Sequence, residues 1–239
     1  MAEPKYGRIL LKLSGEVLAG SQGFGIDPKK ASYLANEVKS IYDLGIEIGL
    51  IIGAGNIFRG IQAASKGMDR VTGDYLGMLA TIMNAISVQD ALEKVNCETR
   101  TLSAINITQI AEPYIRRRAI RHLEKGRIII ISGGTGNPFF TTDSAAALRA
   151  KELGAEIVIK GTKVDGIYDK DPVEFSDAVK YNKISFSEVL EKNLRVMDLT
   201  AITLCKENDL PINVFNINNP GDLKELILEA KIGTFVIKE

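Results

Sequence analysis

The stretch 127-RIIIISGGTGN-137 joins four consecutive isoleucines to a turn that contains three glycines. A short, continuous apolar run that ends at turn residues is typical of a strand buried on both faces of a parallel sheet. Arg8–Leu13 and Glu47–Ile52 have the same form, and each of them also runs into a glycine turn. Because helical patterns separate these runs, the sequence predicts an α/β fold, a three-layer α/β/α sandwich around a mostly parallel central sheet.

Helix caps and glycine stops predict where the other elements lie. Further strands are predicted at Cys97–Leu102, Ile157–Lys160, Ile212–Asn216 and Phe235–Ile237. Helices are predicted from Asp27 to Gly45, from about Asp74 to Glu93, over Arg116–Lys125, from Asp143 to Leu153, after Ser187, after Asp198 and after Pro220–Asp222. The predicted apolar side of the helix from Asp74 consists of Leu79, Ile82, Met83, Ile86 and Leu92. Gly161–Lys183 is predicted as a polar loop region, and we expect one domain over residues 1–239.

Composition and charge argue against several classes of protein. Thirty basic residues balance thirty acidic ones, so neither a nucleic acid nor a membrane surface is expected as a partner. Cys97 and Cys205 lie far apart, which predicts no disulfide framework and no zinc site and fits a cytoplasmic protein. The single histidine, His122, lies in a polar stretch and is predicted at the surface, which argues against a mechanism with a histidine base.

Three glycine turns indicate a site for phosphate groups. The turns lie in 12-KLSGE-16, 53-GAGN-56 and 133-GGTGN-137, each at the end of a predicted strand. Ligands of parallel α/β sheets bind where strands end at the carboxyl edge, and glycine brings bare N–H groups close to an anion. The dinucleotide fingerprint, the phosphate loop and the protein-kinase signatures do not match. Two phosphate-bearing substrates that meet at one edge would explain the number of turns.

Lys12 and Arg59 are the candidates for the positive charge that phosphoryl transfer would require. Lys12 is a point charge at a strand end, and Arg59 can clamp phosphate oxygens with two N–H groups. Asp143 is expected to orient Lys12, to approach a metal or to cap a helix. Each residue also has a purely structural interpretation. Lys12 would then be a lysine at the sheet edge that extends to solvent, and Arg59 would form a surface ion pair.

An acidic loop adds a further candidate. Asp165, Asp169 and Asp171 flank Tyr168. The carboxylates would hold a nucleotide ribose or Mg²⁺, with the tyrosine ring against a base. The alternative is the chemistry of an ordinary solvated turn.

Short motifs follow one another along most of the chain. They are 12-KLSGE-16, 23-GFGI-26, 56-NIFRG-60, 73-GD-74, 77-GMLAT-81, 135-TGNPFFTTD-143, 162-TKVDG-166 and 196-VMDL-199. On these motifs the chain resembles the bacterial uridylate (UMP) kinase family of the amino-acid kinase superfamily, from Arg8 to Ile237. The run GNPFFTTD points to UMP kinases, whereas the lysine start and TKVDG belong to the wider superfamily. The resemblance implies the amino-acid kinase fold.

The resemblance also implies two nucleotide sites. The implied ATP contacts are Lys12, Leu13, Ser14, Gly15, Gly55, Arg59, Thr162, Tyr168 and Asp171. The implied UMP contacts are Ala54, Asp74, Thr135, Gly136, Asn137, Pro138, Phe139, Phe140, Thr141 and Thr142. Lys12, Arg59 and Asp143 would be catalytic, Asp74 would bind ribose hydroxyls, and the family typically has glycine where Ala54 stands.

The implied reaction is ATP + UMP → ADP + UDP, with Mg²⁺ bound mainly through the ATP phosphates and no protein ligand assigned to a metal. The family assembles as hexamers, is commonly inhibited by UTP, and associates one segment with activation by GTP. In this chain that segment is Gly20, Ser21, Gln22, Gly23, Phe24 and Gly25. Two alternatives stay open: another carboxylate or carbamate kinase of the same fold, and a non-catalytic nucleotide-binding storage protein.

Overall fold

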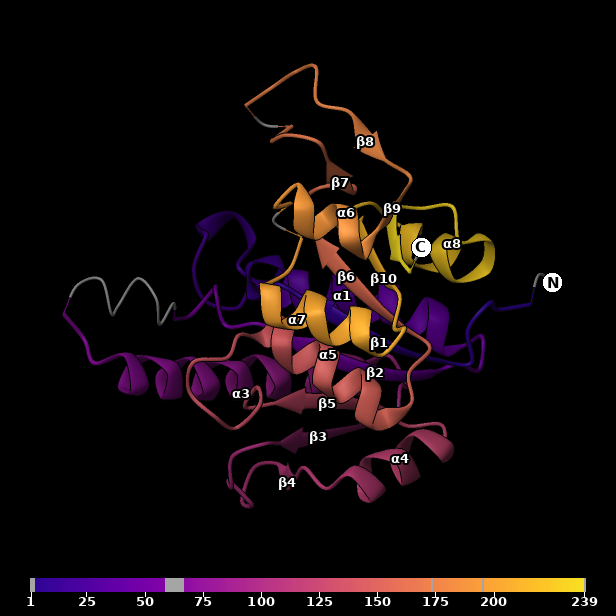
Figure 1. Cartoon of the computed structure of the whole chain (residues 1–239). Coiled ribbons are helices and arrows are strands. Elements are labelled where there is room, and N and C mark those ends of the chain that lie inside the picture. The colour runs from indigo at the N-terminus through magenta and orange to yellow at the C-terminus, as the bar shows by residue number, and fades with distance from the viewer. Residues whose placement is uncertain (1–2, 59–66, 173, 195, 239) are drawn as a thin grey trace.

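The computed structural model describes residues 3–58, 67–172, 174–194 and 196–238. In this part of the chain nine strands form one sheet, in the order β4-β3-β5-β2-β1-β6-β10-β11-β9 (Figure 1). The strands are β1 Arg8–Leu13, β2 Glu47–Ile52, β3 Thr99–Ser103, β4 Glu112–Pro113, β5 Ile128–Ser132, β6 Ile157–Thr162, β9 Lys183–Ser185, β10 Ile212–Asn216 and β11 Thr234–Ile237. Neighbouring strands pair in parallel except β10 and β11, so the predicted mostly parallel sheet is confirmed.

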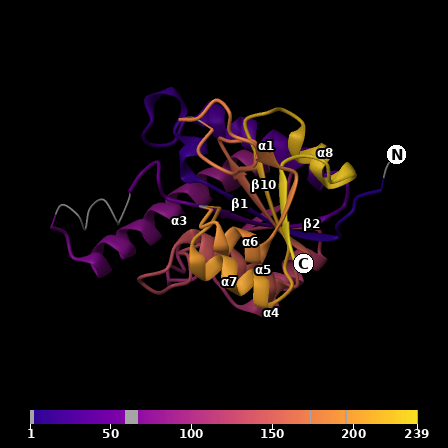
Figure 2. The ribbon, with the colours of Figure 1, turned by 45° about the horizontal axis from the view of Figure 1, so that its top comes forward.

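Helices cover both faces of this sheet. One face carries α1 Pro28–Tyr42, α3 Arg70–Lys94 and α8 Asp222–Glu229. The other carries α4 Arg116–Glu124, α5 Thr142–Leu153, α6 Phe186–Glu191 and α7 Leu199–Glu207. Figure 2 shows α1 and α8 on one side of the strands and α4 to α7 on the other. None of the helices in the described residues has the length and apolar character to cross a membrane.

The isoleucine strand β5 is buried on both faces, as its sequence predicts. Ile128 and Ile130 pack into the core beneath α1, α3 and α8. Ile129 and Ile131 pack into the opposite core, beneath α4, α5 and α7. Successive side chains of a strand point to opposite faces, so one uninterrupted apolar run serves both layers.

Two predicted helix starts are wrong. The helix α3 begins at Arg70, where the carboxylate of Asp69 accepts the N–H of Thr72 at 2.8 Å, and not at Asp74. The cap of α5 is Thr141, whose hydroxyl accepts the N–H of Asp143 at 3.0 Å. The carboxylate of Asp143 lies in the first turn and binds side chains from elsewhere in the fold.

Two further elements begin near the predicted capping residues. Asp198 caps α7, as predicted, by accepting the N–H of Ala201 at 2.8 Å. The predicted cap Ser187 is wrong, because Ser185 forms a capping box with Glu188 at the start of α6. A serine before a helical pattern is ambiguous when another serine lies two residues away.

The region predicted as a polar loop contains a small antiparallel pair, β7 Ile167–Tyr168 and β8 Lys180–Tyr181. The pair lies at the top of Figure 1, outside the main sheet. The strand β6 also extends to Thr162, beyond its predicted end. The strands β4, β7 and β8 have two residues each and β9 has three, which is too short for an apolar periodicity to reveal them.

The predicted apolar side of α3 is wrong in part. Ile82 and Leu92 are buried, but Leu79, Met83 and Ile86 are 44%, 55% and 38% exposed. The helix packs through a different line of residues, which includes Met78, Ala80, Ala85 and Val88. An apolar stripe therefore faces away from the core.

The sequence predicted His122 at the surface, but the structure shows it largely buried. Its side chain is 12% exposed and lies 3.3 Å from a carboxylate oxygen of Glu112. Its Nδ1 lies 3.2 Å from Arg127. The ring is part of a local polar network between α4 and β4.

A pair of glycines tests how tightly β10 is packed. Gly233 has φ +79°, and a Cβ there would overlap the carbonyl oxygen of Val214 and lie 3.0 Å from Phe215 Cβ. Gly45 has φ +80° with no atom within 4 Å of the added Cβ. Gly45→Ala should therefore cost about 1 kcal/mol of unfolding free energy, from backbone strain alone. Gly233→Ala should cost about 3 kcal/mol or more, because overpacking adds to the strain.

Urea denaturation of the two purified variants measures this difference. Equal losses of stability in both variants would contradict the predicted contact between residue 233 and β10.

Candidate active site

The carboxyl ends of β1, β2 and β5 bring the three glycine turns to one edge of the sheet. β2 lies between β1 and β5, so the turns that follow them are neighbours. The N–H of Gly53 donates to the carbonyl of Leu13 at 2.9 Å. A Cβ at Gly15 would overlap the carbonyl oxygen of Gly53 and Oδ1 of Asn56. The first two turns are thus in direct contact, and only glycine at position 15 permits it.

A carboxylate between two lysines lies at this edge. Asp143 Oδ1 is 2.6 Å from Lys12 Nζ, and Asp143 Oδ2 is 2.9 Å from Lys160 Nζ. Lys12 and Lys160 face each other in register on the paired strands β1 and β6. Lys160 also donates to the carbonyl of Val196 at 2.6 Å. The prediction that Asp143 orients Lys12 fits this geometry, and the same carboxylate orients a second lysine.

The charges of this group influence one another. Burial alone would raise the pKa of the Asp143 carboxyl, but the charges of Lys12 and Lys160 outweigh burial and hold that pKa below its ordinary value. Burial lowers the pKa of the Lys160 ammonium, and the Asp143 carboxylate opposes that change. Two cations that share one anion are suited to bind an incoming anionic group.

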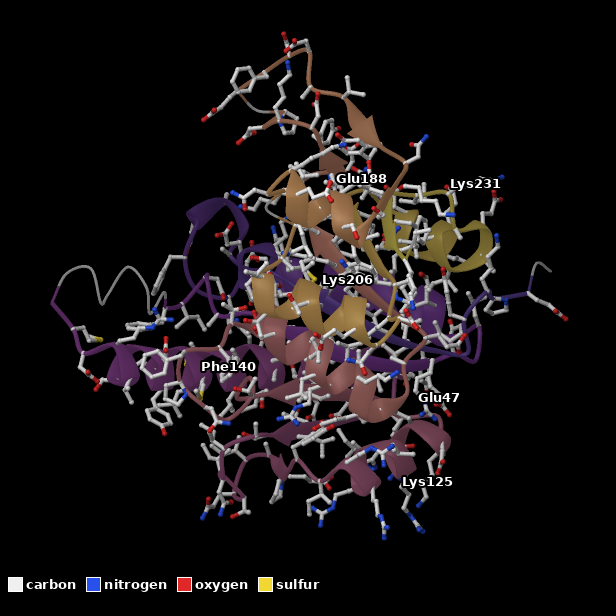
Figure 3. The ribbon with its side chains drawn as sticks, in the orientation of Figure 1. Glu47, Lys125, Phe140, Glu188, Lys206 and Lys231 are labelled. Atoms are coloured by element: carbon white, nitrogen blue, oxygen red, sulfur yellow. The ribbon has the colours of Figure 1, made fainter. Side chains whose placement is uncertain are left out.

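Most residues predicted to bind UMP line one cavity of about 440 Å³. The predicted residues in its wall are Ala54, Asp74, Thr135, Asn137, Phe140, Thr141 and Thr142, and Figure 3 shows Phe140 beside α3. Gly55, predicted to contact ATP phosphates, lines the same cavity. Gly136, Pro138 and Phe139 do not line it.

The carboxylate of Asp74 holds the loop over this cavity. It accepts the N–H of Phe139 at 2.8 Å and forms an ion pair with Arg70 at 2.9 Å. Phe139 has φ +71°, a conformation that non-glycine residues rarely adopt, and its ring lies 5.8 Å from the Arg70 guanidinium carbon. Phe139 therefore helps to place the loop rather than to line the cavity.

The residues predicted on the adenosine side line a second cavity, also of about 440 Å³. Thr162, Tyr168 and Asp171 all lie in its wall, together with Lys160. The structure thus separates the two predicted nucleotide groups into two cavities, with the lysine–aspartate group between them. Thr142, the neighbour of Asp143, lines the first cavity, and Lys160 lines the second.

Two carboxylates of the acidic loop hold the β7–β8 pair together. Asp165 accepts the hydroxyl of Tyr168 at 2.6 Å and the ammonium of Lys180 at 3.0 Å. Asp169 accepts the N–H of Val179 at 2.8 Å. Among the described residues, no group of three His, Cys, Asp or Glu side chains is placed to hold a metal ion. Asp165 and Asp169 therefore have structural partners within this loop.

Three other predictions concern the turn after β1 and the segment Gly20–Gly25. Leu13 is fully buried in the core, so only its backbone can face a nucleotide. The hydroxyl of Ser14 caps the short helix η1 Gly15–Leu18. The segment begins with a second short helix, η2 Gly20–Gln22, and exposes 67% of Phe24.

Arg59, predicted to be catalytic and to contact ATP, lies outside the described residues.

The sequence does not predict a role at the site for two polar residues next to Asp143 and α5. Lys160 is predicted only as part of a strand, although its position near the end of a buried strand is like that of Lys12. Asp198 was predicted only as a cap, but it also accepts the hydroxyls of Thr141 and of Ser144, the latter at 2.9 Å. The signal for Lys160 was present in the sequence, whereas the contacts of Asp198 with α5 depend on packing.

Comparison with known proteins is consistent with this geometry. The model of the amino acid kinase family matches residues 7–216. The crystal structure of UMP kinase from Bacillus anthracis has a TM-score of 0.94 and 40% identity, over 98% of this chain and 97% of that chain. UMP kinase from Ureaplasma parvum has a TM-score of 0.91 and 38% identity over 100% of both chains. Uridylate kinase from Archaeoglobus fulgidus has a TM-score of 0.74 and 25% identity, over 95% of this chain and 99% of that chain.

Asp143→Asn should destabilise the fold at neutral pH by about 3–5 kcal/mol, because it leaves two buried ammonium groups without their counter-ion. Because the folded-state pKa of Asp143 is lowered, its contribution is present above the unfolded pKa and is lost as pH falls through the folded value. The difference between wild type and Asp143→Asn should therefore shrink below about pH 4.

Denaturant unfolding across pH measures this difference. Asp90→Asn is the matched control, because it breaks an exposed ion pair with Lys94 and should cost less than about 1 kcal/mol. A difference between wild type and Asp143→Asn that does not depend on pH would refute the electrostatic role.

Proposed function

This chain belongs to the amino acid kinase family, and we propose that it is an ATP-dependent UMP kinase, which forms UDP and ADP in pyrimidine nucleotide biosynthesis. One observation carries the proposal: the Lys12–Asp143–Lys160 group lies between two cavities of equal size. The cavity next to Thr142 takes UMP, and the cavity that contains Lys160 takes the adenosine of ATP. The transferred phosphoryl group then passes close to both lysines.

The chemistry needs positioning and charge more than proton transfer. The phosphate of UMP is itself the nucleophile, and it is already largely deprotonated at neutral pH, so no general base is required. Lys12 and Lys160 stabilise charge on the transferred group, and the glycine turns add N–H donors. Asp143 holds both lysines in place, and Arg59 completes the proposed set of cations.

Mg²⁺ enters this proposal with the nucleotide. The carboxylate of Asp143 is already shared by two ammonium groups, and Asp165 and Asp169 hold the β7–β8 pair. Such a donor set fits an ion held mainly by the oxygens of ATP phosphates. The ion would neutralise phosphate charge during transfer.

The cavity wall offers groups that can read a uracil ring. Asn137 and Thr135 form a compact turn, in which the N–H of Asn137 donates to the Thr135 hydroxyl at 3.2 Å. Thr141 is engaged with Asp198 and with the start of α5, so its hydroxyl is less suited to a base contact. We assign base recognition to Thr135, Asn137 and Thr142, and ribose recognition to Asp74.

An exposed apolar stripe supports assembly with further copies of this chain. Tyr75, Leu79, Met83 and Ile86 are 38% to 55% exposed and follow one another at helical spacing on α3. Exposed apolar surface of this kind marks sites of protein contact. A homo-oligomer, with a hexamer as its proposed size, would cover the stripe.

Regulation by nucleotides belongs to the same proposal. The segment Gly20–Gly25 is assigned to activation by GTP, and its exposed Phe24 ring is available for contact. UTP is the proposed inhibitor. Both effects are measurable as changes in UMP turnover when each nucleotide is added.

Two alternatives predict different substrates. A carboxylate or carbamate kinase of the same fold would phosphorylate acetylglutamate or a similar acid and would ignore UMP. A storage protein would bind ATP without turnover, which the lysine–aspartate group does not favour. ADP release with UMP, CMP, dUMP, AMP and acetylglutamate, each offered separately with ATP, separates all three.

The enzyme should prefer UMP to CMP by roughly 10⁴-fold in kcat/KM, because a site built for uracil leaves polar groups unpaired against cytosine. Asn137→Ala should reduce that ratio. Comparable kcat/KM with UMP and CMP would contradict the assignment as a UMP kinase. An unchanged UMP-to-CMP ratio in Asn137→Ala would show that other residues recognise the base.

Lys12→Ala should lower kcat by on the order of 100-fold or more, because it removes a cation at the site of charge development. The KM for UMP should change far less. Steady-state kinetics on the folded variant measure both values, and an unchanged kcat would exclude Lys12 from the mechanism.

A further inference from the structure

The long helix α3 passes beside two of the glycine turns and carries buried polar side chains on that side. Thr81 is 4% exposed and Asn84 is completely buried. They lie three residues apart, so they share one face of the helix. Buried polar groups in a helix are normally hydrogen-bonded, and the partners of these two lie in the nucleotide site.

Thr81 holds the turn after β5. Its hydroxyl oxygen accepts the N–H of Gly133 at 2.8 Å and donates to the carbonyl of Met78 at 2.6 Å. Gly133 has φ +73° and begins the turn that leads to Thr135. The first N–H of this turn is therefore attached to α3, and Thr81 itself lines the UMP cavity.

Asn84 holds the turn after β2. Its amide nitrogen donates to the carbonyl of Gly53 at 2.7 Å and to Oδ1 of Asn56 at 2.8 Å. The amide nitrogen of Asn56 returns a hydrogen bond to Asn84 Oδ1 at 2.9 Å and donates to the carbonyl of Gly25 at 2.7 Å. The two backbone carbonyls determine the orientation of both amides, because each must face a nitrogen.

We infer that Thr81 and Asn84 are positioning residues, which hold the Gly133 and Gly53 turns at one fixed separation beside the UMP cavity. Ala54 and Gly55 from the turn after β2, and Gly134 and Thr135 from the turn after β5, all line that cavity. Both turns are thus hydrogen-bonded to the same helix, α3. Small displacements of such groups reduce catalysis strongly, since N–H donors act only when they are correctly placed. This inference rests on the proposed function.

A purely structural role would appear in stability alone. Loss of a buried hydrogen bond leaves the N–H of Gly133 or the carbonyl of Gly53 unsatisfied and lowers the melting temperature in either case. A positioning role also changes the kinetics with UMP and the local exposure of the turn. The experiment therefore needs kinetic and amide-exchange readouts together with stability.

Thr81→Val and Thr81→Ser form the first test. Valine keeps the shape of threonine without the hydroxyl, whereas serine keeps the hydroxyl. Thr81→Val should lower kcat/KM for UMP by about 10- to 100-fold and increase amide exchange in a peptide that contains Gly133. Thr81→Ser should stay within about threefold of wild type in both measurements. If Thr81→Val does not fold, Thr81→Ala takes its place.

Asn84→Leu and Asn213→Leu form the second test. Asn213 is also completely buried, donates to the carbonyl of Ile232 at 2.9 Å and lies on β10, away from the two turns. Both substitutions should lower stability, but only Asn84→Leu should lower kcat/KM for UMP by about 10-fold or more.

The outcomes separate the inference from the proposed function. Wild-type kcat and KM in folded Thr81→Val or Asn84→Leu would overturn the inference, as would an equal kinetic loss in Asn213→Leu. If wild-type protein does not phosphorylate UMP, the proposed function fails. The amide exchange of the Gly133 turn then decides the inference: an increase in Thr81→Val supports it, and no change overturns it.

Discussion

The carboxylate of Asp143 is the interaction on which the site depends. Lys12 and Lys160 lie opposite each other on two paired strands, and two buried ammonium groups at that distance repel unless an anion lies between them. Asp143 supplies the anion from the first turn of α5, so the position of that helix on the sheet sets the position of both cations.

The start of α5 is held in turn by α7. Asp198 caps α7 through the N–H of Ala201 and accepts the hydroxyls of Thr141 and Ser144. One carboxylate thereby orders the first turn of one helix against the first turn of another. Lys160 donates a hydrogen bond to the carbonyl of Val196, which lies just before α7. The arrangement of the cations thus extends over β1, β6, α5 and α7, which no local stretch of chain encodes.

The helix α3 has a second role in the fold, because its two sides face different surroundings. Its inner side provides Thr81 and Asn84 for the glycine turns, and Asp74 holds the loop at Phe139. Its other side exposes the apolar stripe of Leu79, Met83 and Ile86. A contact between copies of the chain on this stripe would involve the same helix that holds the Gly53 and Gly133 turns. Assembly and nucleotide binding would then share one rigid body.

The sequence alone was sufficient for the longer strands of the sheet and for the glycine turns that follow them. Four consecutive isoleucines in β5 favour burial on both faces, and parallel pairing brings the carboxyl ends of such strands to the same edge of the sheet. The sequence also predicted that Asp143 orients Lys12, and the structure brings the two side chains into an ion pair. It did not reveal that Asp143 binds a second lysine, that Thr141 rather than Asp143 caps α5, or that Leu79, Met83 and Ile86 lie outside the core. Those facts depend on the angle and separation at which the helices pack on the sheet. Such packing brings together residues that are far apart in the chain, and a local sequence pattern carries no information about it.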